Sequence, residues 1–243
     1  MWQNARVCVV VPAYREARIL PRMLRRLPAY VDDIVVVDDA SDDATAEAAR
    51  SVQDARVRVV THPQNRGVGA AIVTGYRAGL AAGADVLAVM AADDQMHPDD
   101  LRGVIAPISE GSADYVKGNR FVHPEARRMP LLRRVGGEVL SFATRRATGL
   151  RVTDCQCGFT ALSASMARRL PLHELWPRFG YPNDLLGLLA ERGARVAEVP
   201  VRPVYADETS QIRAFHVASI LYLIARRRVL TQRRRAVSAQ SGS

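Results

Sequence analysis

A short acidic segment carries the side chains best suited to chemistry. Asp93, Asp94 and Gln95 directly follow an apolar run at 86–90 that is typical of a β-strand. Carboxylate and amide oxygens are hard ligands suited to Mg²⁺ or Mn²⁺, and Mg²⁺ often takes only one or two protein carboxylates while phosphates and water complete its shell. Acidic residues at a strand end can instead cap the following helix, so two interpretations of this segment stay open.

Further polar loops follow three other apolar runs. They read Pro12-Ala13-Tyr14-Arg15-Glu16, Asp38-Asp39-Ala40-Ser41-Asp42 and Asn65-Arg66-Gly67-Val68-Gly69. The third loop lacks the last glycine of a dinucleotide-binding fingerprint, and no glycine-rich loop carries the Lys-Ser or Lys-Thr of a P-loop. Its glycines are more consistent with a connection that passes close to a ligand or to neighbouring backbone.

The elements that must position these loops alternate between strand and helix patterns. Apolar β-branched runs lie at 7–11, 33–37, 57–60 and 86–90, and helix-like segments lie at 17–27, 44–52, 68–82 and 98–108. This alternation is typical of an α/β fold with a mostly parallel sheet flanked by helices. Ligands of such folds bind beyond the carboxyl ends of the strands, which is where all four polar loops fall.

The second half of the chain has a looser pattern. We expect a strand at 114–117, an arginine-rich helix at 131–148, a helix at 184–192, a strand at 195–199 and an amphipathic helix from 211 past 228. These elements divide the chain into one domain over residues 1–212 and a C-terminal amphipathic helix with a basic tail over residues 213–243.

Composition limits the class of protein. The chain has 243 residues, of which 48% are hydrophobic and 24% charged, as expected for an ordered globular domain. Its formal charge of +9 indicates affinity for polyanions such as nucleic acid, phosphates or anionic lipid. Three cysteines form no even disulfide framework, and the first residues lead directly into a strand, so the cytosol is the expected compartment. The longest apolar stretch near the C-terminus, 215–225, is too short to span a bilayer.

The polar loops, in this order and spacing, resemble the successive motifs of family 2 glycosyltransferases with the GT-A fold. These motifs are Val10-Val11-Pro12-Ala13-Tyr14-Arg15-Glu16, Val37-Asp38-Asp39-Ala40-Ser41-Asp42-Asp43-Ala44-Thr45, Asn65-Arg66-Gly67-Val68-Gly69-Ala70-Ala71 and Ala91-Ala92-Asp93-Asp94-Gln95. The likeness extends to the polyprenyl-phosphate sugar transferases of the dolichol-phosphate mannose synthase group through Lys117-Gly118-Asn119-Arg120, Asp154-Cys155-Gln156-Cys157-Gly158-Phe159 and Glu208-Thr209-Ser210. It covers roughly residues 6 to 213.

The resemblance implies a nucleotide-sugar donor and assigns residues to it. The residues implied to bind the donor are Pro12, Tyr14, Glu16, Asp39, Gly67, Asp93 and Gln95. Tyr14 offers an aromatic face and a hydroxyl, while Glu16 and Asp39 can accept hydrogen bonds from ribose hydroxyls or base N–H groups. Helix capping is the alternative role for Glu16 and Asp39.

The implied metal site departs from the family pattern. The family commonly has Asp-x-Asp-x-Gln, with Asp93 and Gln95 matching its last two ligands, but Ala91 stands at the position of the first aspartate. Either Mg²⁺ or Mn²⁺ is held by Asp93, Gln95 and the donor diphosphate with extra water, or the affinity for metal is weakened. Asp94 is expected to point elsewhere, because neighbouring residues at a strand end face opposite ways.

A second group of residues suits an acceptor phosphate. A phosphate monoester carries about −1.5 to −2 charge at neutral pH, so it is already a nucleophile and needs positioning more than a general base. Lys117, Arg120, Arg133 and Arg134 are the basic candidates, with Arg120 foremost because arginine's planar fork suits phosphate.

Two carboxylates could take part on the acceptor side. Asp154 or Asp184 could act as a base if the acceptor were a hydroxyl, and could order arginines or bind sugar hydroxyls if it were a phosphate. Asp184 opens an apolar helix, so helix capping is an equally good interpretation of that residue.

These observations favour one function. We expect an inverting hexosyl or N-acetylhexosaminyl transfer from a UDP- or GDP-sugar to a polyprenyl phosphate, at the cytoplasmic face of a membrane and without nucleic acid. Arginines at 226–228 and 233–235 could bind an anionic leaflet, although the apolar part of the terminal helix could equally pack on the core. The alternatives are transfer to a soluble hydroxyl or amine, and a nucleotide-binding partner subunit without catalysis.

Overall fold

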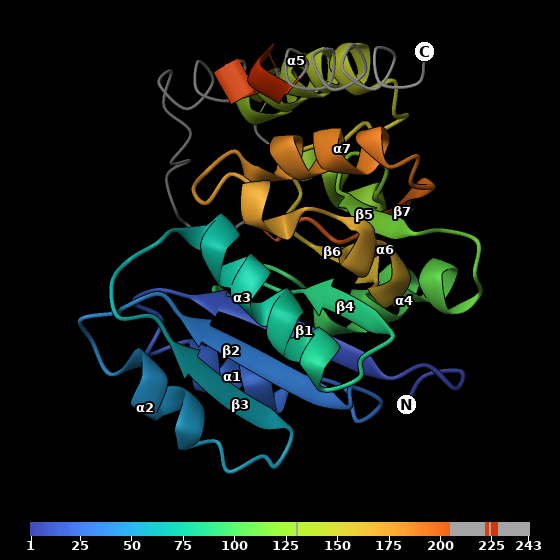
Figure 1. Ribbon diagram of the computed structural model, residues 1–243. Helices are drawn as coiled ribbons and strands as arrows, with labels where there is room; N and C mark the ends of the chain where they lie inside the picture. The colour runs from blue at the N-terminus through green and yellow to red at the C-terminus, as the bar shows by residue number, and fades with distance from the viewer. Residues whose placement is uncertain (130, 205–221, 224, 228–243) are drawn as a thin grey trace.

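The central element of the fold is a mixed β-sheet, seen in the computed structural model, which describes residues 1–129, 131–204, 222–223 and 225–227 (Figure 1). Within those residues the sheet has seven strands in the order β3-β2-β1-β4-β6-β5-β7. The strands are β1 (Val7–Ala13), β2 (Asp33–Asp38), β3 (Val57–Thr61), β4 (Val86–Val89), β5 (Tyr115–Asn119), β6 (Thr160–Ser163) and β7 (Val196–Pro200).

One strand runs against the others. β1 to β4 are parallel to one another, β5 is parallel to β7, and β6 pairs antiparallel with both β4 and β5. The predicted mostly parallel α/β sheet is therefore confirmed. β6 was not predicted, because its four residues are all buried and show neither the length nor the alternation that marks a strand in sequence.

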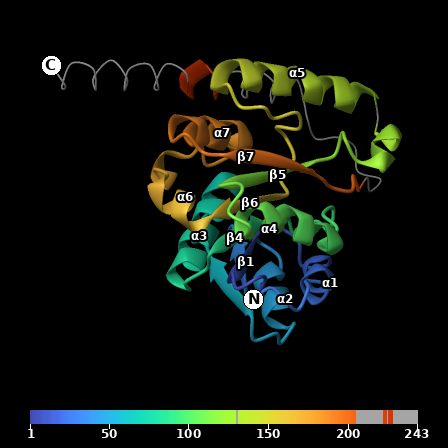
Figure 2. The ribbon, with the colours of Figure 1, turned by 90° about the vertical axis from the view of Figure 1, so that its right-hand side faces the viewer.

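Helices cover both faces of the sheet, and each face has its own apolar core (Figures 1 and 2). Odd-numbered valines of β1 pack with α1, α2 and α4, whereas Cys8 and Val10 pack with α3, α6 and α7. The helices are α1 (Leu20–Arg25), α2 (Thr45–Arg50), α3 (Val68–Ala81), α4 (Leu101–Ser109), α5 (Leu131–Thr148), α6 (Ala164–Arg169) and α7 (Tyr181–Glu191), with short 3₁₀ turns η1 (Pro98–Asp100), η2 (Pro124–Arg128) and η3 (Leu172–Glu174).

Helix α3 lies unusually close to the sheet. A Cβ on Gly75 would lie only 2.1 Å from Cγ1 of Val10, so glycine at this position allows the helix to contact β1 directly. This approach fixes the helix axis relative to β1 and β2. The N-terminus of α3, which begins after Gly67, is thereby held at the carboxyl edge of the sheet.

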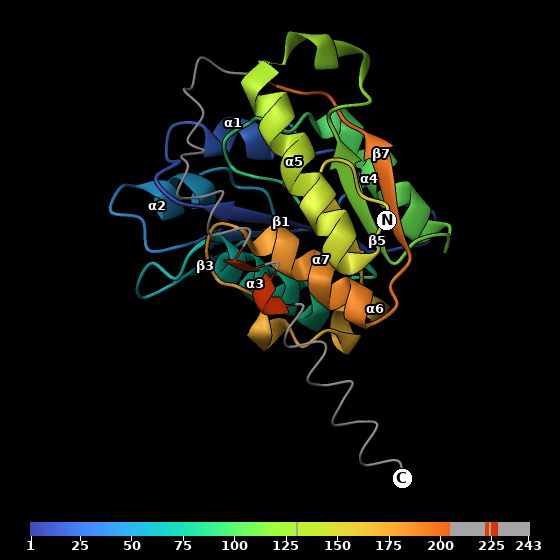
Figure 3. The same cartoon turned by 90° about the horizontal axis from the view of Figure 1, so that it is seen from above.

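Helix α5 forms an outer layer that contacts α7 (Figure 3). Leu140 and Thr144 on its inner face are buried, whereas Phe142 on its outer face is 63% exposed. The predicted bounds of this helix, 131–148, match the structure.

The described part of the C-terminal region is helical and packs on the protein. Leu223 and Arg227 are buried, at 1% and 4% exposure. Within the described residues, no helix is both long and apolar enough to cross a bilayer. Most of the predicted region 213–243 lies outside those residues, as do the motif at 208–210 and the arginines at 233–235.

Candidate active site

The carboxyl ends of the parallel strands bring the predicted loops to one edge of the sheet. Ala13 at the end of β1 pairs with Asp38 at the end of β2, and Pro12 is half-buried one residue earlier. Three of these loops contain a non-glycine residue in the left-handed region. Arg15, Ala40 and Asp94 follow β1, β2 and β4 with φ values of 60°, 59° and 57°, in a region that costs a non-glycine residue about 1 kcal/mol or more.

Asp39 holds two of the loops together. Its side chain is nearly inaccessible, and its Oδ1 lies 2.6 Å from Nδ1 of His62 and accepts a hydrogen bond from the backbone N of Arg66 at 2.9 Å. Oδ2 accepts from the backbone N of Gly67 at 2.6 Å. The carboxylate therefore bonds to the loop after β3, whereas the N-cap residue of α2, the helix that follows Asp39, is Ala44.

His62 was missed by sequence reasoning. It is 5% exposed, and its Nε2 lies 2.9 Å from Oγ1 of Thr74 in α3, while its other ring nitrogen meets Asp39. The only signal in the sequence was a histidine directly after a predicted strand. His62 therefore orients the Asp39 carboxylate and links it to α3 through Thr74.

The loop after β1 presents an exposed aromatic ring. Tyr14 is 42% exposed, and the guanidinium of Arg15 lies 5.1 Å from the centre of its ring. Arg15 also pairs with Asp42 at 2.6 Å, and the backbone N of half-buried Glu16 donates to Oγ1 of Thr45 at 2.9 Å. These contacts fasten the first loop to the second, so Tyr14 and Glu16 lie beside the loop that contains Asp39.

In the acidic loop, adjacent carboxylates have different partners. Oδ1 of Asp93 accepts from the backbone N of Gln95 at 3.0 Å, which closes a tight turn. The Asp94 carboxylate is held by Arg22 of α1 at 2.5 Å and by Arg26, directly after α1, at 2.8 Å, and its side chain is only 8% exposed. Asp94 therefore points toward α1, as its position next to Asp93 predicts.

The donor atoms fit a shared divalent cation better than a closed metal site. Asp93 supplies one half-buried carboxylate, Gln95 one amide oxygen, and Ala91 nothing. No group of three or more His, Cys, Asp and Glu side chains in the described parts of the chain forms a metal cage. One carboxylate with one amide suits Mg²⁺ or Mn²⁺ whose remaining positions are filled by phosphate and water.

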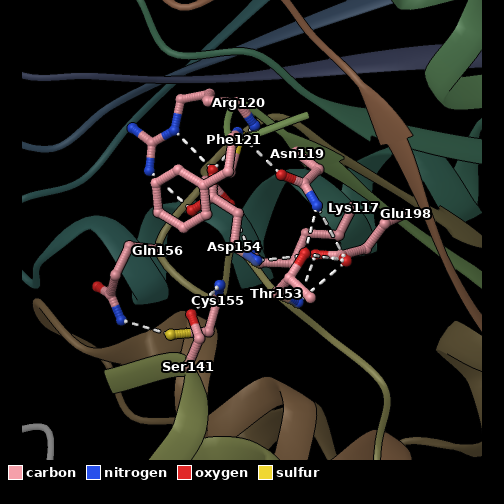
Figure 4. A network of polar contacts seen from close by, with 11 residues as sticks. Lys117, Asn119, Arg120, Phe121, Ser141, Thr153, Asp154, Cys155, Gln156 and Glu198 are labelled. Atoms are coloured by element: carbon pink, nitrogen blue, oxygen red, sulfur yellow. Dashed lines mark hydrogen bonds and ion pairs between the residues drawn. The ribbon is translucent and has the colours of Figure 1, made fainter. Parts of the chain in front are cut away.

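Arg120 follows β5 and is fixed by a buried carboxylate (Figure 4). Asp154 receives three hydrogen bonds from it: Nε at 2.8 Å and backbone N at 3.1 Å on Oδ2, and Nη2 at 2.9 Å on Oδ1. Burial works to raise the pKa of Asp154, but the hydrogen bonds and charge of Arg120 outweigh it and bring the pKa below its usual value. The Arg120 side chain remains 29% exposed, against 1% for Asp154.

Glu198 of β7 holds the loop that supplies Asp154. Its carboxylate accepts from the backbone N of Thr153 and of Asp154, both at 2.9 Å, and from Oγ1 of Thr153 at 2.7 Å (Figure 4). Nδ2 of Asn119 donates to the same group at 3.1 Å. Sequence reasoning missed Glu198, whose only signal was a charge inside an apolar strand pattern.

The other basic candidates of the acceptor group lie elsewhere. Lys117 is fully buried, donates from Nζ to the carbonyl of Cys157 at 2.5 Å, and has a pKa lowered by burial. This corrects the expectation that Lys117 faces a ligand, because every residue of β5 is enclosed. Arg134 is half exposed and pairs with Glu138 at 3.1 Å, while the side chain of Arg133 lies outside the described part of the structure.

Asp184 is enclosed in an ion pair. Its Oδ1 and Oδ2 accept from Nε and Nη2 of Arg227, both at 2.8 Å, and Oδ2 also accepts from the backbone N of Trp176 at 2.8 Å. This geometry favours a structural role, and a catalytic role for Asp184 stays a prediction. Arg227, expected on a membrane-facing surface, is instead buried against α7, because the carboxylate offers it a bidentate partner.

Comparison with known proteins identifies the relatives of this chain. The family model described as glycosyl transferase family 2 matches residues 8–171. A UDP-N-acetylglucosamine–dolichyl-phosphate N-acetylglucosaminyltransferase of Methanococcus voltae is 31% identical over 217 residues, covering 83% of this chain and 86% of that protein. An undecaprenyl-phosphate mannosyltransferase of Micrococcus luteus is 34% identical over 203 residues, covering 81% of this chain and 82% of that protein.

Solved structures share the fold. Glucosyl-3-phosphoglycerate synthase from Mycobacterium tuberculosis, crystallised with Mn²⁺, uridine diphosphate and phosphoglyceric acid, superposes with a TM-score of 0.71. The match covers 93% of this chain and 79% of the other, at 21% sequence identity.

Replacing Asp154 tests the contact that fixes Arg120. We expect Asp154→Asn to lower the free energy of unfolding by about 2–3 kcal/mol at pH 7, because the asparagine cannot balance the Arg120 charge. The native pKa of Asp154 is below its ordinary value of 3.8, so the stabilisation is fully present above pH 3.8 and fades as the pH falls below it.

Urea unfolding of the wild type and of Asp154→Asn, from pH 7 to below pH 3.8, measures the effect. Asp99→Asn, at a side chain that is 80% exposed, provides the control and should change stability by less than about 0.5 kcal/mol. Equal stability of Asp154→Asn and the wild type at pH 7 would contradict the assignment.

Proposed function

The chain belongs to glycosyl transferase family 2, and we propose that it moves a hexosyl or N-acetylhexosaminyl group from a UDP- or GDP-sugar to a polyprenyl phosphate. It is a glycosyltransferase with the GT-A fold. Its relatives from Methanococcus voltae and Micrococcus luteus are named for transfer to dolichyl phosphate and undecaprenyl phosphate. The observation that carries the proposal within this chain is Arg120, held bidentately by buried Asp154 at the end of β5.

The donor nucleotide is assigned to the loops after β1, β2 and β3. Exposed Tyr14 supplies an aromatic face, and Glu16 and Asp39 supply acceptors, with Pro12 and Gly67 shaping the backbone beside them. The orientation of Asp39 is set in advance by three hydrogen-bond contacts, which supports a binding role because little ordering is left to occur when the nucleotide arrives.

Asp93 and Gln95 are assigned to the cation that accompanies the diphosphate. When bound, Mg²⁺ or Mn²⁺ would stabilise the negative charge that develops on the departing nucleoside diphosphate. The chain's own contribution is to hold Asp93 in its turn and to keep Asp94 turned toward α1.

The proposed reaction is a single displacement. An oxygen of the acceptor phosphate forms a bond to the anomeric carbon, and the bond from that carbon to the donor diphosphate breaks on the opposite side, which inverts the configuration. Arg120 positions the acceptor phosphate and offsets its charge. The engagement of Asp154 and Asp184 with arginines supports a phosphate acceptor over a hydroxyl, because a hydroxyl would require a base.

A membrane-bound acceptor is supported by the outer face of α5. Val135, Val139 and Phe142 are 48%, 56% and 63% exposed, and their spacing of four and three residues places them on one side of the helix. Arg146, also exposed, belongs to the same side. An apolar stripe with a basic residue is suited to the interface of an anionic leaflet, so we assign peripheral attachment at the cytoplasmic face to α5.

Incubation with radiolabelled UDP- and GDP-sugars and polyprenyl phosphate tests the reaction. We expect labelled lipid from the wild type, and a KM for polyprenyl phosphate at least about tenfold higher in Arg120→Lys, because lysine keeps the charge but cannot make the bidentate contact with Asp154 that positions it. Arg127→Lys, at an exposed position, should behave as the wild type. Labelled product from water-soluble acceptors alone, or no product from any donor, would refute the proposal.

The metal assignment predicts a separate effect on nucleotide affinity. Asp93→Asn should lose most of the gain in UDP or GDP affinity that Mn²⁺ gives the wild type, at least about tenfold, because it removes the one carboxylate ligand. Calorimetric titrations with and without Mn²⁺ measure this gain. Asp99→Asn should keep it, and an equal gain in Asp93→Asn would show that the cation is held by other groups.

Vesicle flotation tests the assignment of α5. We expect the double variant Val139→Ser and Phe142→Ser to bind phosphatidylglycerol-containing vesicles at least about tenfold more weakly than the wild type, because both side chains lose apolar area that the interface would bury. Both sites are exposed, so the fold should be unaffected. Val68→Ser, at an exposed valine of α3, is the matched control, and unchanged flotation of the double variant would exclude this face.

A further inference from the structure

We infer that Asp184 and Arg227 are positioning residues for the donor loop that contains Gly67, and that the described end of the chain thereby sets nucleotide affinity. The inference rests on the proposed donor site. It assigns a role to a carboxylate that the displacement does not use and to an arginine that lies far from Gly67 in sequence. The structure connects them by a continuous series of close contacts.

The series begins with a desolvated ion pair. The side chains of Asp184 and Arg227 are 0% and 4% exposed, and they form two parallel hydrogen bonds of 2.8 Å. Arg227 also lies 3.5 Å from Glu174 and 3.9 Å from Glu191. Because three carboxylates surround one cation in a site with little water, the position of Arg227 is closely defined.

Helix α7 is shaped to admit the Arg227 stem. A Cβ on Gly187 would lie 2.5 Å from Cγ of Arg227, so even an alanine there would displace the arginine. Gly187 is three residues after Asp184 and shares its side of the helix. Gly187 therefore makes room for the aliphatic part of the Arg227 side chain, and Asp184 binds its guanidinium.

The Asp184–Arg227 pair also holds the Trp176 loop, which is the segment between η3 and α7. Oδ2 of Asp184 accepts a hydrogen bond from the backbone N of Trp176 at 2.8 Å, and Nε1 of Trp176 donates to the carbonyl of Phe179 at 3.0 Å. Arg227 and Trp176 therefore share one carboxylate. Loss of the arginine would leave Asp184 with an uncompensated charge and would change its hydrogen bond to the loop.

The Trp176 loop supports the donor loop directly. The carbonyl of Pro177 accepts from the backbone N of Ala70 at 3.1 Å. A Cβ on Gly67 would lie 2.5 Å from that carbonyl oxygen, and a Cβ on Gly69 would lie 2.3 Å from the carbonyl oxygen of Trp176. Gly67 and Gly69 thus allow the donor loop to approach the backbone of the Trp176 loop so closely that any side chain at either glycine would clash.

The last contact reaches the nucleotide site. The backbone N of Gly67 donates to Oδ2 of Asp39 at 2.6 Å. Movement of the Trp176 loop would therefore shift Gly67 and the carboxylate assigned to the nucleotide. Arg120, after β5, has no part in this series, so the acceptor side should be unaffected.

Calorimetric titration of UDP and GDP in the presence of Mn²⁺ tests the inference. We expect Asp184→Asn and Gly187→Ala each to raise the Kd of the nucleotide that the wild type binds by roughly tenfold, with no change in the KM for polyprenyl phosphate. Gly187→Ala keeps every charged group, so it tests the same contact if Asp184→Asn folds poorly. Melting temperatures identify any variant that does not fold.

Two controls separate positioning from loss of stability. Asp114→Asn breaks a similar bidentate pair, in which Asp114 binds Arg195 at 2.9 and 3.1 Å, and Gly103→Ala adds a methyl group where nothing lies within 4 Å. Both should leave the nucleotide Kd unchanged, whatever their melting temperatures.

The outcomes distinguish this inference from the proposed function. A wild type that binds neither UDP nor GDP would refute both. A wild type that binds nucleotide, with Asp184→Asn and Gly187→Ala binding equally well, would overturn the positioning role alone. An equal loss of affinity in the Asp114→Asn control would also overturn it, because the effect would then follow from general destabilisation.

Discussion

Desolvated carboxylates hold the loops of this glycosyltransferase in place. Asp39, Asp154 and Asp184 are each almost fully buried, and a buried charge is tolerated only when hydrogen-bond donors surround it. The donors come from distant segments: the loop after β3, the residue after β5, and the described end of the chain. Each carboxylate therefore joins segments that are far apart in sequence, and the geometry of the edge where the strands end depends on these three groups.

This use of acidic residues fits the proposed chemistry. Asp154 and Asp184, one of which could have served as the base for a hydroxyl acceptor, are both paired with arginine. A phosphate acceptor arrives deprotonated and needs a positioned cation, which the Arg120 side chain supplies while remaining partly exposed. The two halves of the proposed site thus differ in kind, with oxygen acceptors around the donor nucleotide and a guanidinium on the acceptor side.

Sequence periodicity was sufficient for the mostly parallel α/β sheet and for the edge of that sheet on which the candidate loops lie, because strand and helix patterns depend on local burial. It failed for β6, whose four enclosed residues have no distinctive pattern, and for the partners of charged side chains. Lys117, Glu198 and Arg227 look like surface charges in sequence, yet each is fixed by groups at least 40 residues away. His62 is a similar case, since its role depends on Asp39 and Thr74 meeting it in space.

The crowding of acidic groups around Arg227 has a consequence for shortened versions of the chain. A version that stops before this arginine would leave Asp184, Glu174 and Glu191 facing one another without their common counterion. The buried charge of Asp184 would then lack its partner, and α7 would pack less firmly, because breaking one side of a buried ion pair is costly. The stability of α7 would thus depend on whether a shortened chain keeps Arg227.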